Sequence, residues 1–190
     1  ILIQPVPAVA RHIFYTLDDV TDLPRALDAL AQLADGIATV AGLGVSVLQA
    51  LGRNLEPLRV FPALSNQGID VPSTQQALWL WLRGDDRGEL LFRSMQLDKA
   101  LAPAFKQVQV TDAFRYLSGH DLSGYEDGTE NPVDDEAVEV VTAPGAEGGS
   151  YAAIQHWEHD LAHFKSLSQQ EQDHIIGRRL SDNEEIDDAP

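Results

Sequence analysis

The sequence predicts an α+β fold in which an antiparallel sheet carries two helices on one face. Three observations support this prediction: several short apolar segments with β-prone residues, two longer segments with helical periodicity, and the order in which they occur over roughly the first 117 residues. That order is strand, helix, strand, long loop, strand, helix, strand. It is typical of the split βαβ arrangement of ferredoxin-like domains.

The first strand and helix have clear signals. Residues 11–17 are mostly apolar and β-prone, as expected of a buried strand. A helix should follow with Pro24 in its first turn, because leucines and alanines then recur along one helical face and Gly36 comes where a C-terminal cap belongs. Residues 43–51 are expected to form the second strand.

The second half of the domain repeats this order. Residues 76–83 alternate strongly, with leucines on one side and Trp79 and Trp81 on the other, which predicts a strand covered on both faces. Residues 89–101 are expected to form a helix, and residues 106–116 the fourth strand. The apolar positions of that helix are expected broadly on one side: Leu90, Leu91, Met95, Leu97 and Leu101.

The composition changes after Tyr116. Residues 118–144 are rich in glycine, proline and acidic side chains and are expected to form a long loop, a feature that is usually functional in a compact domain. Residues 150–157 are predicted as a strand, followed by helical pieces at 160–165 and 168–176. Ser168 and Glu171 have the spacing of a capping box at the start of the second piece.

These elements predict three regions. Residues 8–117 form a ferredoxin-like N-terminal domain, residues 118–147 a loop and linker, and residues 148–190 the incomplete start of a second domain. The chain opens with isoleucine and its acidic end follows no packed element, so it is expected to be cut short.

The charge and composition exclude several classes of partner. The formal net charge is −17, which disfavours nucleic acids and anionic membranes as partners, and no apolar run approaches the length of a membrane span. The chain has no cysteine, so it has neither disulfides nor thiolate-bound metal, and a cytoplasmic location is expected.

One segment concentrates polar chemistry. Residues 124–132 read GYEDGTENP, which sets Asp127 between glycines that allow unusual backbone dihedrals and close approach of a ligand. Asn131 before Pro132 favours a turn. Such a loop can hold a carboxylate rigidly over a flat partner, but an ordinary acidic surface turn has the same composition. From these residues alone both interpretations stay open.

Four ordered segments carry a resemblance to a known family. Residues 121–132 (DLSGYEDGTENP) contain its GxxDG signature and match beyond it. The other three are residues 148–160 (GGSYAAIQHWEHD), 171–178 (EQDHIIGR) and 182–188 (DNEEIDD). Together they resemble the dye-decolorizing peroxidases.

The resemblance implies two ferredoxin-like domains and haem b as cofactor, held largely by the second domain. It implies oxidation of aromatic dyes, phenols or similar donors by hydrogen peroxide, with Asp127 as the distal acid–base that moves a proton during O–O cleavage. By the same resemblance, the residues bordering the haem are Asp127, Gly128, Thr129, Gln155 and Arg178. A surface ion pair is an equally good interpretation of Arg178.

The resemblance also implies an axial histidine beyond Pro190. None of the six histidines takes its place, so residues 1–190 alone are not expected to be a competent peroxidase. His156, His159 and His163 would share a face only on one continuous helix, and the strand predicted there argues against a metal site.

Two alternatives and several partners stay open. The chain could be a haem- or porphyrin-binding protein without turnover, or a structural unit such as the cargo of a protein shell. A homo-oligomer is expected from the resemblance. The tryptophans Trp79, Trp81 and Trp157 could relay electrons to bulky substrates, although packing in the core is the expectation favoured for strand positions.

Overall fold

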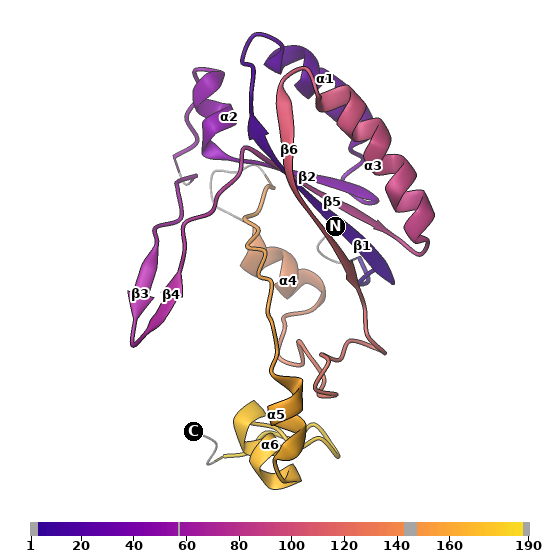
Figure 1. Cartoon of the computed structure of the whole chain (residues 1–190), viewed down its shortest axis with the longest axis vertical. Coiled ribbons are helices and arrows are strands. Elements are labelled where there is room, and N and C mark those ends of the chain that lie inside the picture. Colours follow the sequence, from indigo (N-terminus) through magenta and orange to yellow (C-terminus); the bar gives the residue numbers. More distant parts are fainter. Residues whose placement is uncertain (1–3, 57, 143–147, 188–190) are drawn as a thin grey trace. The chain divides into compact units, whose positions relative to one another are not determined.

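The computed structural model describes residues 4–56, 58–142 and 148–187, and the chain divides into two compact units. The first, called here the sheet unit, comprises Ile1–Phe114 and Asp134–Ala152. The second, called here the loop unit, comprises Arg115–Val133 and Ala153–Pro190. Each unit is coloured along the sequence in Figure 1 and is described by itself below.

The sheet unit contains a four-stranded sheet in the order β2-β5-β1-β6, in which every neighbouring pair is antiparallel. This is the predicted α+β, ferredoxin-like arrangement: the first strand lies between the third and the fourth, and the second strand lies at an edge. The strands are β1 (Val9–Leu17), β2 (Thr39–Leu43), β5 (Leu78–Gly84) and β6 (Phe105–Phe114).

Two helices cover one face of this sheet, α1 (Leu23–Leu33) and α3 (Arg87–Leu101), which lie side by side (Figure 1). The leucines of β5 face them, because alternate residues of a strand point to the same side. Burial of this apolar cluster is the main source of the unit's stability. Its larger members are Ile13, Tyr15, Leu23, Leu30, Leu78, Leu80, Leu82, Leu90, Leu97 and Leu101.

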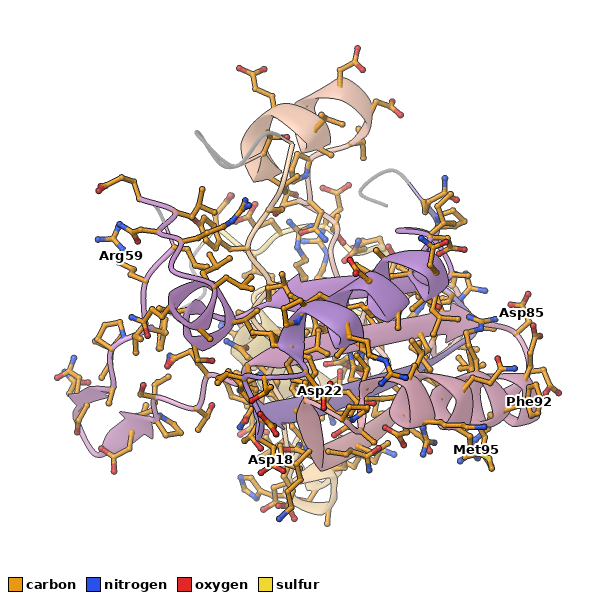
Figure 2. All side chains as sticks on the ribbon, turned by 90° about the horizontal axis from the view of Figure 1, so that it is seen from above. Asp18, Asp22, Arg59, Asp85, Phe92 and Met95 are labelled. Atoms are coloured by element: carbon orange, nitrogen blue, oxygen red, sulfur yellow. The ribbon has the colours of Figure 1, made fainter. Side chains whose placement is uncertain are left out.

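The helix α3 begins at Asp86, whose carboxylate accepts a hydrogen bond from the backbone N–H of Glu89 at 2.8 Å. Its predicted apolar side was partly wrong. Leu91 and Met95 lie with Phe92 on the exposed side of the helix, as Figure 2 shows for the two labelled residues, Phe92 and Met95. The buried residues instead recur at Leu90, Leu97 and Leu101, closer to the true helical period.

The opposite face of the sheet carries β5 residues Trp79 and Trp81, both half-buried. Trp79 lies across Gly42 of the neighbouring strand β2: a Cβ at position 42 would stand 2.9 Å from Cε3 of the indole. Glycine at this position therefore gives the ring its room.

Residues 43–51 do not form the predicted second strand. The strand β2 ends at Leu43, and the helix α2 (Val45–Ala50) follows, with Val47 fully buried. A short apolar run fits a buried helix as well as a strand, and Gly44, which precedes α2, separates the strand from the helix within the predicted range. The following loop also contains a hairpin of β3 (Leu64–Asn66) and β4 (Ile69–Val71), which the sequence analysis missed.

Within the described residues, β6 is followed by α4 (Asp134–Val141) in the sheet unit, and by α5 (Leu161–Ser166) and α6 (Gln169–Ile176) in the loop unit. The helix α4 lies inside residues 118–144, so the prediction of a continuous loop there was partly wrong. The predicted capping box of Ser168 and Glu171 is confirmed, and Gly177 ends α6 in the left-handed conformation. The predicted strand at 150–157 is wrong, because residues 151–160 have no regular secondary structure. In the described ranges, no helix is both long and apolar enough to cross a membrane.

Candidate active site

The segment predicted to carry chemistry folds back on itself within the loop unit. Single antiparallel bridges join Tyr116 to His120 and His120 to Glu126. The backbone N–H of Asp127 donates to the carbonyl of Gly119 at 2.8 Å. The main chain of the predicted acid–base residue is therefore tied down on one side by a backbone hydrogen bond.

Gly128 gives the turn its shape. Its φ is +80°, in the left-handed region where residues with a Cβ are strained. A Cβ built there would also stand 2.5 Å from Nδ2 of Asn131. The glycine after Asp127 is thus required both by its dihedral angle and by the space around it, as the sequence suggested.

Tyr125 anchors the loop and is only 3% exposed. Its hydroxyl donates to Oδ1 of Asp173 on α6 at 2.5 Å, and its ring meets Phe164 edge-on at a centroid distance of 6.1 Å. Nε2 of Gln169 donates to the same hydroxyl at 3.0 Å. Burial, with the adjoining carboxylate, raises the pKa of Tyr125, so the hydroxyl keeps the proton that makes this bond.

The carboxylate of Asp173 accepts hydrogen bonds from groups on α6, on the turn beyond it and on Tyr125. Besides the Tyr125 hydroxyl, its Oδ1 accepts from Nε2 of Gln169 at 2.7 Å and from the backbone N–H of Leu180 at 3.1 Å. These hydrogen bonds, that from Tyr125 above all, lower the pKa of Asp173. The carboxylate stays charged and fastens the loop to α6.

Asn183 braces the turn from both sides of Asp127. Its Nδ2 donates to Oε2 of Glu126 at 3.0 Å and to Oγ1 of Thr129 at 2.8 Å. One amide group thereby holds the residue before Asp127 and the residue after Gly128. Asn183 lies in a segment that resembles the family, but no local pattern in the sequence indicates its role, because its two partners lie 57 and 54 positions away.

Arg178, a predicted site residue, joins this brace. Its side chain is 18% exposed, with NH2 donating to Oε1 of Glu130 at 2.6 Å and NH1 to the backbone carbonyl of Asn183 at 2.8 Å. The guanidinium therefore ties the end of the turn to the segment that holds Asn183. An ion pair was one of the two interpretations left open for this residue, and the structure contains that pair.

Asp127 itself is exposed to solvent. Three acids stand on this turn, and two of them have partners: Glu126 accepts from Asn183, and Glu130 from Arg178. The side chain of Asp127 makes no hydrogen bond or ion pair within the described residues. The backbone of Asp127 is fixed by its hydrogen bond to Gly119, and the neighbouring acids Glu126 and Glu130 already have partners. The carboxylate of Asp127 is therefore available to a molecule from outside the loop unit.

Gln155 is not part of this cluster. It is exposed in the irregular stretch before α5, and its Oε1 accepts from Nε1 of Trp157 at 3.0 Å. Over the part of the chain that the structure describes, no hydrogen bond joins Gln155 to residues 127–129. The structure thus brings together Asp127, Gly128, Thr129 and Arg178.

The exposed face of the turn has two features that suit a haem. Asp127 offers a carboxylate without a partner among the described residues, and Gly128 has no side chain to keep a flat ring away, so these residues would fit against one face of a porphyrin. Among residues 4–56, 58–142 and 148–187, no three or more His, Cys, Asp or Glu side chains are grouped to hold a metal ion. A cavity of about 170 Å³ in the loop unit is lined by Tyr125, Glu126 and Asn183 but not by Asp127.

Residues 118–189 match a family model described as "Dyp-type peroxidase, C-terminal". A dye-decolorizing peroxidase of Brevibacterium linens is 33% identical over 185 residues, which cover 92% of this chain and 50% of that protein. One of Rhodococcus erythropolis is 27% identical over 205 residues, which cover 98% of this chain and 60% of that protein. The chain thus spans about half the length of the curated relatives it matches.

Solved structures are similar over nearly the whole chain. A putative dyp-type peroxidase from Shewanella oneidensis has a TM-score of 0.85 at 24% identity, with 98% of this chain and 66% of that one covered, a likeness of fold. The encapsulated DyP-type peroxidase from Mycobacterium smegmatis has a TM-score of 0.76 at 27% identity, with 98% of this chain and 67% of that one covered.

Proposed function

This chain belongs to the dye-decolorizing peroxidase family, and we propose that in the whole protein it supplies the distal acid–base residue, Asp127, of a haem-dependent peroxidase. The substrates are hydrogen peroxide and a reducing donor such as an aromatic dye or a phenol. The family identity rests on the matches above, whereas the activity and the roles of individual residues are inferred.

One observation carries the assignment of Asp127. Its backbone is tied to Gly119, while its carboxylate, unlike those of Glu126 and Glu130, has no partner in the described chain. Asp side chains in turns often accept hydrogen bonds from nearby backbone N–H groups, and the carboxylate of Asp127 accepts none within the described residues. An unpaired carboxylate on a braced turn is instead suited to exchange protons with a substrate.

In the proposed reaction, this carboxylate would first accept a proton and then donate it. One oxygen of Asp127 would accept a proton from hydrogen peroxide and then donate it to the departing oxygen, which leaves as water. The haem, when bound, supplies the redox chemistry that splits the O–O bond. Asn183 and Arg178 would keep the carboxylate in place by holding Glu126, Thr129 and Glu130.

The remaining predicted residues take supporting roles. Gly128 and Thr129 would lie against the porphyrin, since the glycine leaves the backbone open to it. Gln155 and Arg178 would border the cofactor or its propionates. We propose haem b as the cofactor, as the resemblance to the family implies.

The wider setting is also proposed. Residence in a protein shell is suggested by the encapsulated relative from Mycobacterium smegmatis, and a homo-oligomer is proposed from the resemblance to the family. A cytoplasmic location agrees with the absence of cysteine from the sequence. The net charge of −17 argues against nucleic acid or an anionic membrane as a partner.

The test replaces Asp127 by Asn in the full-length protein that contains this chain. We expect the variant to take up haem as the unchanged protein does, measured by the Soret band. Its rate of reaction with peroxide, measured by stopped flow, should fall on the order of a hundredfold, because an amide cannot accept the proton.

Glu126→Gln is the matched control. It removes the neighbouring acid but leaves Asp127 intact, so its peroxide reaction should stay close to that of the unchanged protein. If both variants lost activity equally, the turn as a whole would matter and Asp127 would have no special role. If the full-length protein bound haem but consumed no peroxide, it would be a porphyrin-binding protein on this scaffold.

A further inference from the structure

A cluster of three near-parallel rings lies on the face of the sheet opposite α1 and α3. It comprises His12 of β1 and Trp79 and Trp81 of β5, which are adjacent antiparallel strands. The ring centroid of His12 lies 5.9 Å from that of Trp79, with an interplanar angle of 7°. It lies 6.0 Å from the ring centroid of Trp81, with an interplanar angle of 12°. The two indoles are 6.2 Å apart.

The first indole has a proton acceptor. Nε1–H of Trp79 donates to Nδ1 of His12 at 3.2 Å, so the histidine proton must lie on Nε2. Partial burial lowers the pKa of His12, which keeps the imidazole neutral near neutral pH and leaves Nδ1 free to take a proton. Trp79 and His12 thus form a donor and base pair within the strand framework.

The second indole has the opposite surroundings. Cζ of Arg83 stands 4.7 Å from the centroid of the Trp81 ring, and Arg83 is 8% exposed. The guanidinium donates to the backbone carbonyls of Pro5 and Ile37, so these hydrogen bonds do not neutralise its charge. Nε1 of Trp81 is buried with no hydrogen-bond partner among the described residues.

We propose that Trp79 and His12 form a one-electron redox site. On oxidation, Trp79 gives one electron to the oxidant, and its Nε1 proton passes to Nδ1 of His12. The products are a neutral indolyl radical and an imidazolium, and a reducing donor restores both by returning the electron as the proton goes back. The natural oxidant rests on the proposed function, whose peroxidase cycle would supply a one-electron acceptor.

The same surroundings explain why Trp79 is oxidised in preference to Trp81. Loss of an electron from Trp81 would place a positive ring beneath the Arg83 cation, and Coulomb repulsion disfavours that state. Trp81 also has no base among the described residues to accept its proton, whereas Trp79 does. Gly42 leaves room for the Trp79 ring in this position, because any Cβ there would meet the indole.

The experiment oxidises the full-length protein with a photochemically generated ruthenium(III) complex, so that neither haem nor peroxide takes part. Trp157, which is 71% exposed, is replaced by Phe in every sample to remove its own oxidation. Transient absorption separates the neutral tryptophan radical from the protonated cation radical. The compared variants are Trp79→Phe, the matched Trp81→Phe, and His12→Leu.

We expect a neutral tryptophan radical that Trp81→Phe preserves and Trp79→Phe reduces severalfold. His12→Leu should convert the signal to the cation radical or slow its formation, and D₂O should slow formation in the protein that retains His12. The deuterium measurement needs no substitution at the site, so it still tests whether a proton leaves the tryptophan during oxidation if a variant fails to fold; equal rates in H₂O and D₂O would overturn the proposal.

Equal losses in the two tryptophan variants would overturn the proposal, as would a cation radical that persists in the protein with His12 intact. Absence of peroxidase activity would leave this result unaffected, because the oxidant is external. Failure of the proposed function and failure of the redox site can therefore be told apart.

Discussion

Different interactions stabilise the sheet unit and the loop unit internally. The sheet unit buries a continuous apolar cluster between β1, β5, α1 and α3. In the loop unit, Tyr125 is the one buried hydrophobic side chain among the described residues. Hydrogen bonds of Asp173, Asn183 and Arg178 hold its turn in place. Hydrophobic burial is strong but has little direction, whereas hydrogen bonds are directional and individually modest.

This difference shows which unit can fix the positions of individual atoms. The turn of Asp127 lies in the unit that depends on directional bonds, each of which positions a particular atom. Its shape should therefore respond to small polar changes that barely alter overall stability. The sheet unit should behave in the reverse way, losing stability with any large core deletion.

The largest effect is expected from Leu80→Ala. Leu80 is fully buried in the central strand β5, so the substitution should lower the free energy of unfolding of the sheet unit by about 2–5 kcal/mol. Urea denaturation followed by circular dichroism measures this. Leu91→Ala is the control: that side chain is 47% exposed, and a change beyond about 0.5 kcal/mol there would contradict the proposed core.

Gly128→Ala should have an intermediate effect, about 1–2 kcal/mol, because alanine disfavours a φ of +80° and its Cβ would meet Asn131. Thermal unfolding measures the loss. Gly36→Ala is the matched control, since Gly36 has a φ of +72° and nothing within 4 Å of an added Cβ. Equal losses in the two variants would mean that the contact with Asn131 contributes nothing.

The smallest global effect is expected from Tyr125→Phe, which removes one hydroxyl and keeps the ring. The hydrogen bond to Asp173 would be lost, so amide exchange across residues 119–131 should become faster while that of β1 and β5 stays unchanged. Hydrogen–deuterium exchange with mass spectrometry measures both regions. Uniform acceleration across the two units would show that the tether is not local.

Much of the sheet unit could be predicted from sequence because its signals are local. Residues 76–83 alternate leucine with tryptophan, and the structure places the leucines in the core and the tryptophans on the other face. The strand predicted over residues 43–51 was wrong because a short apolar run has no decisive period. In the structure, β2 ends at Leu43 and a helix follows it. The predicted strand at 150–157 failed in the same way, since β-prone residues alone do not provide a pairing partner.

In the candidate site too, local features could be predicted from the sequence and long-range contacts could not. The motif located Asp127 and Gly128, and the positive φ of the glycine agrees with its place in the sequence. The contact between Arg178 and Glu130 and the brace by Asn183 were not predictable, because each joins residues about fifty positions apart. The roles of Asp127, Thr129 and Gln155 at a haem stay predictions.

The sequence by itself determined β1, α1, β5, α3 and β6, the capping box of α6, and the glycine needed beside Asp127. These depend on neighbours within a few residues, where periodicity and allowed dihedral angles act. Only the tertiary structure decided that Asn183 holds both flanks of Asp127 and that Trp79 donates to His12. Such pairings arise when distant segments pack, and their geometry depends on the path of the whole chain between them.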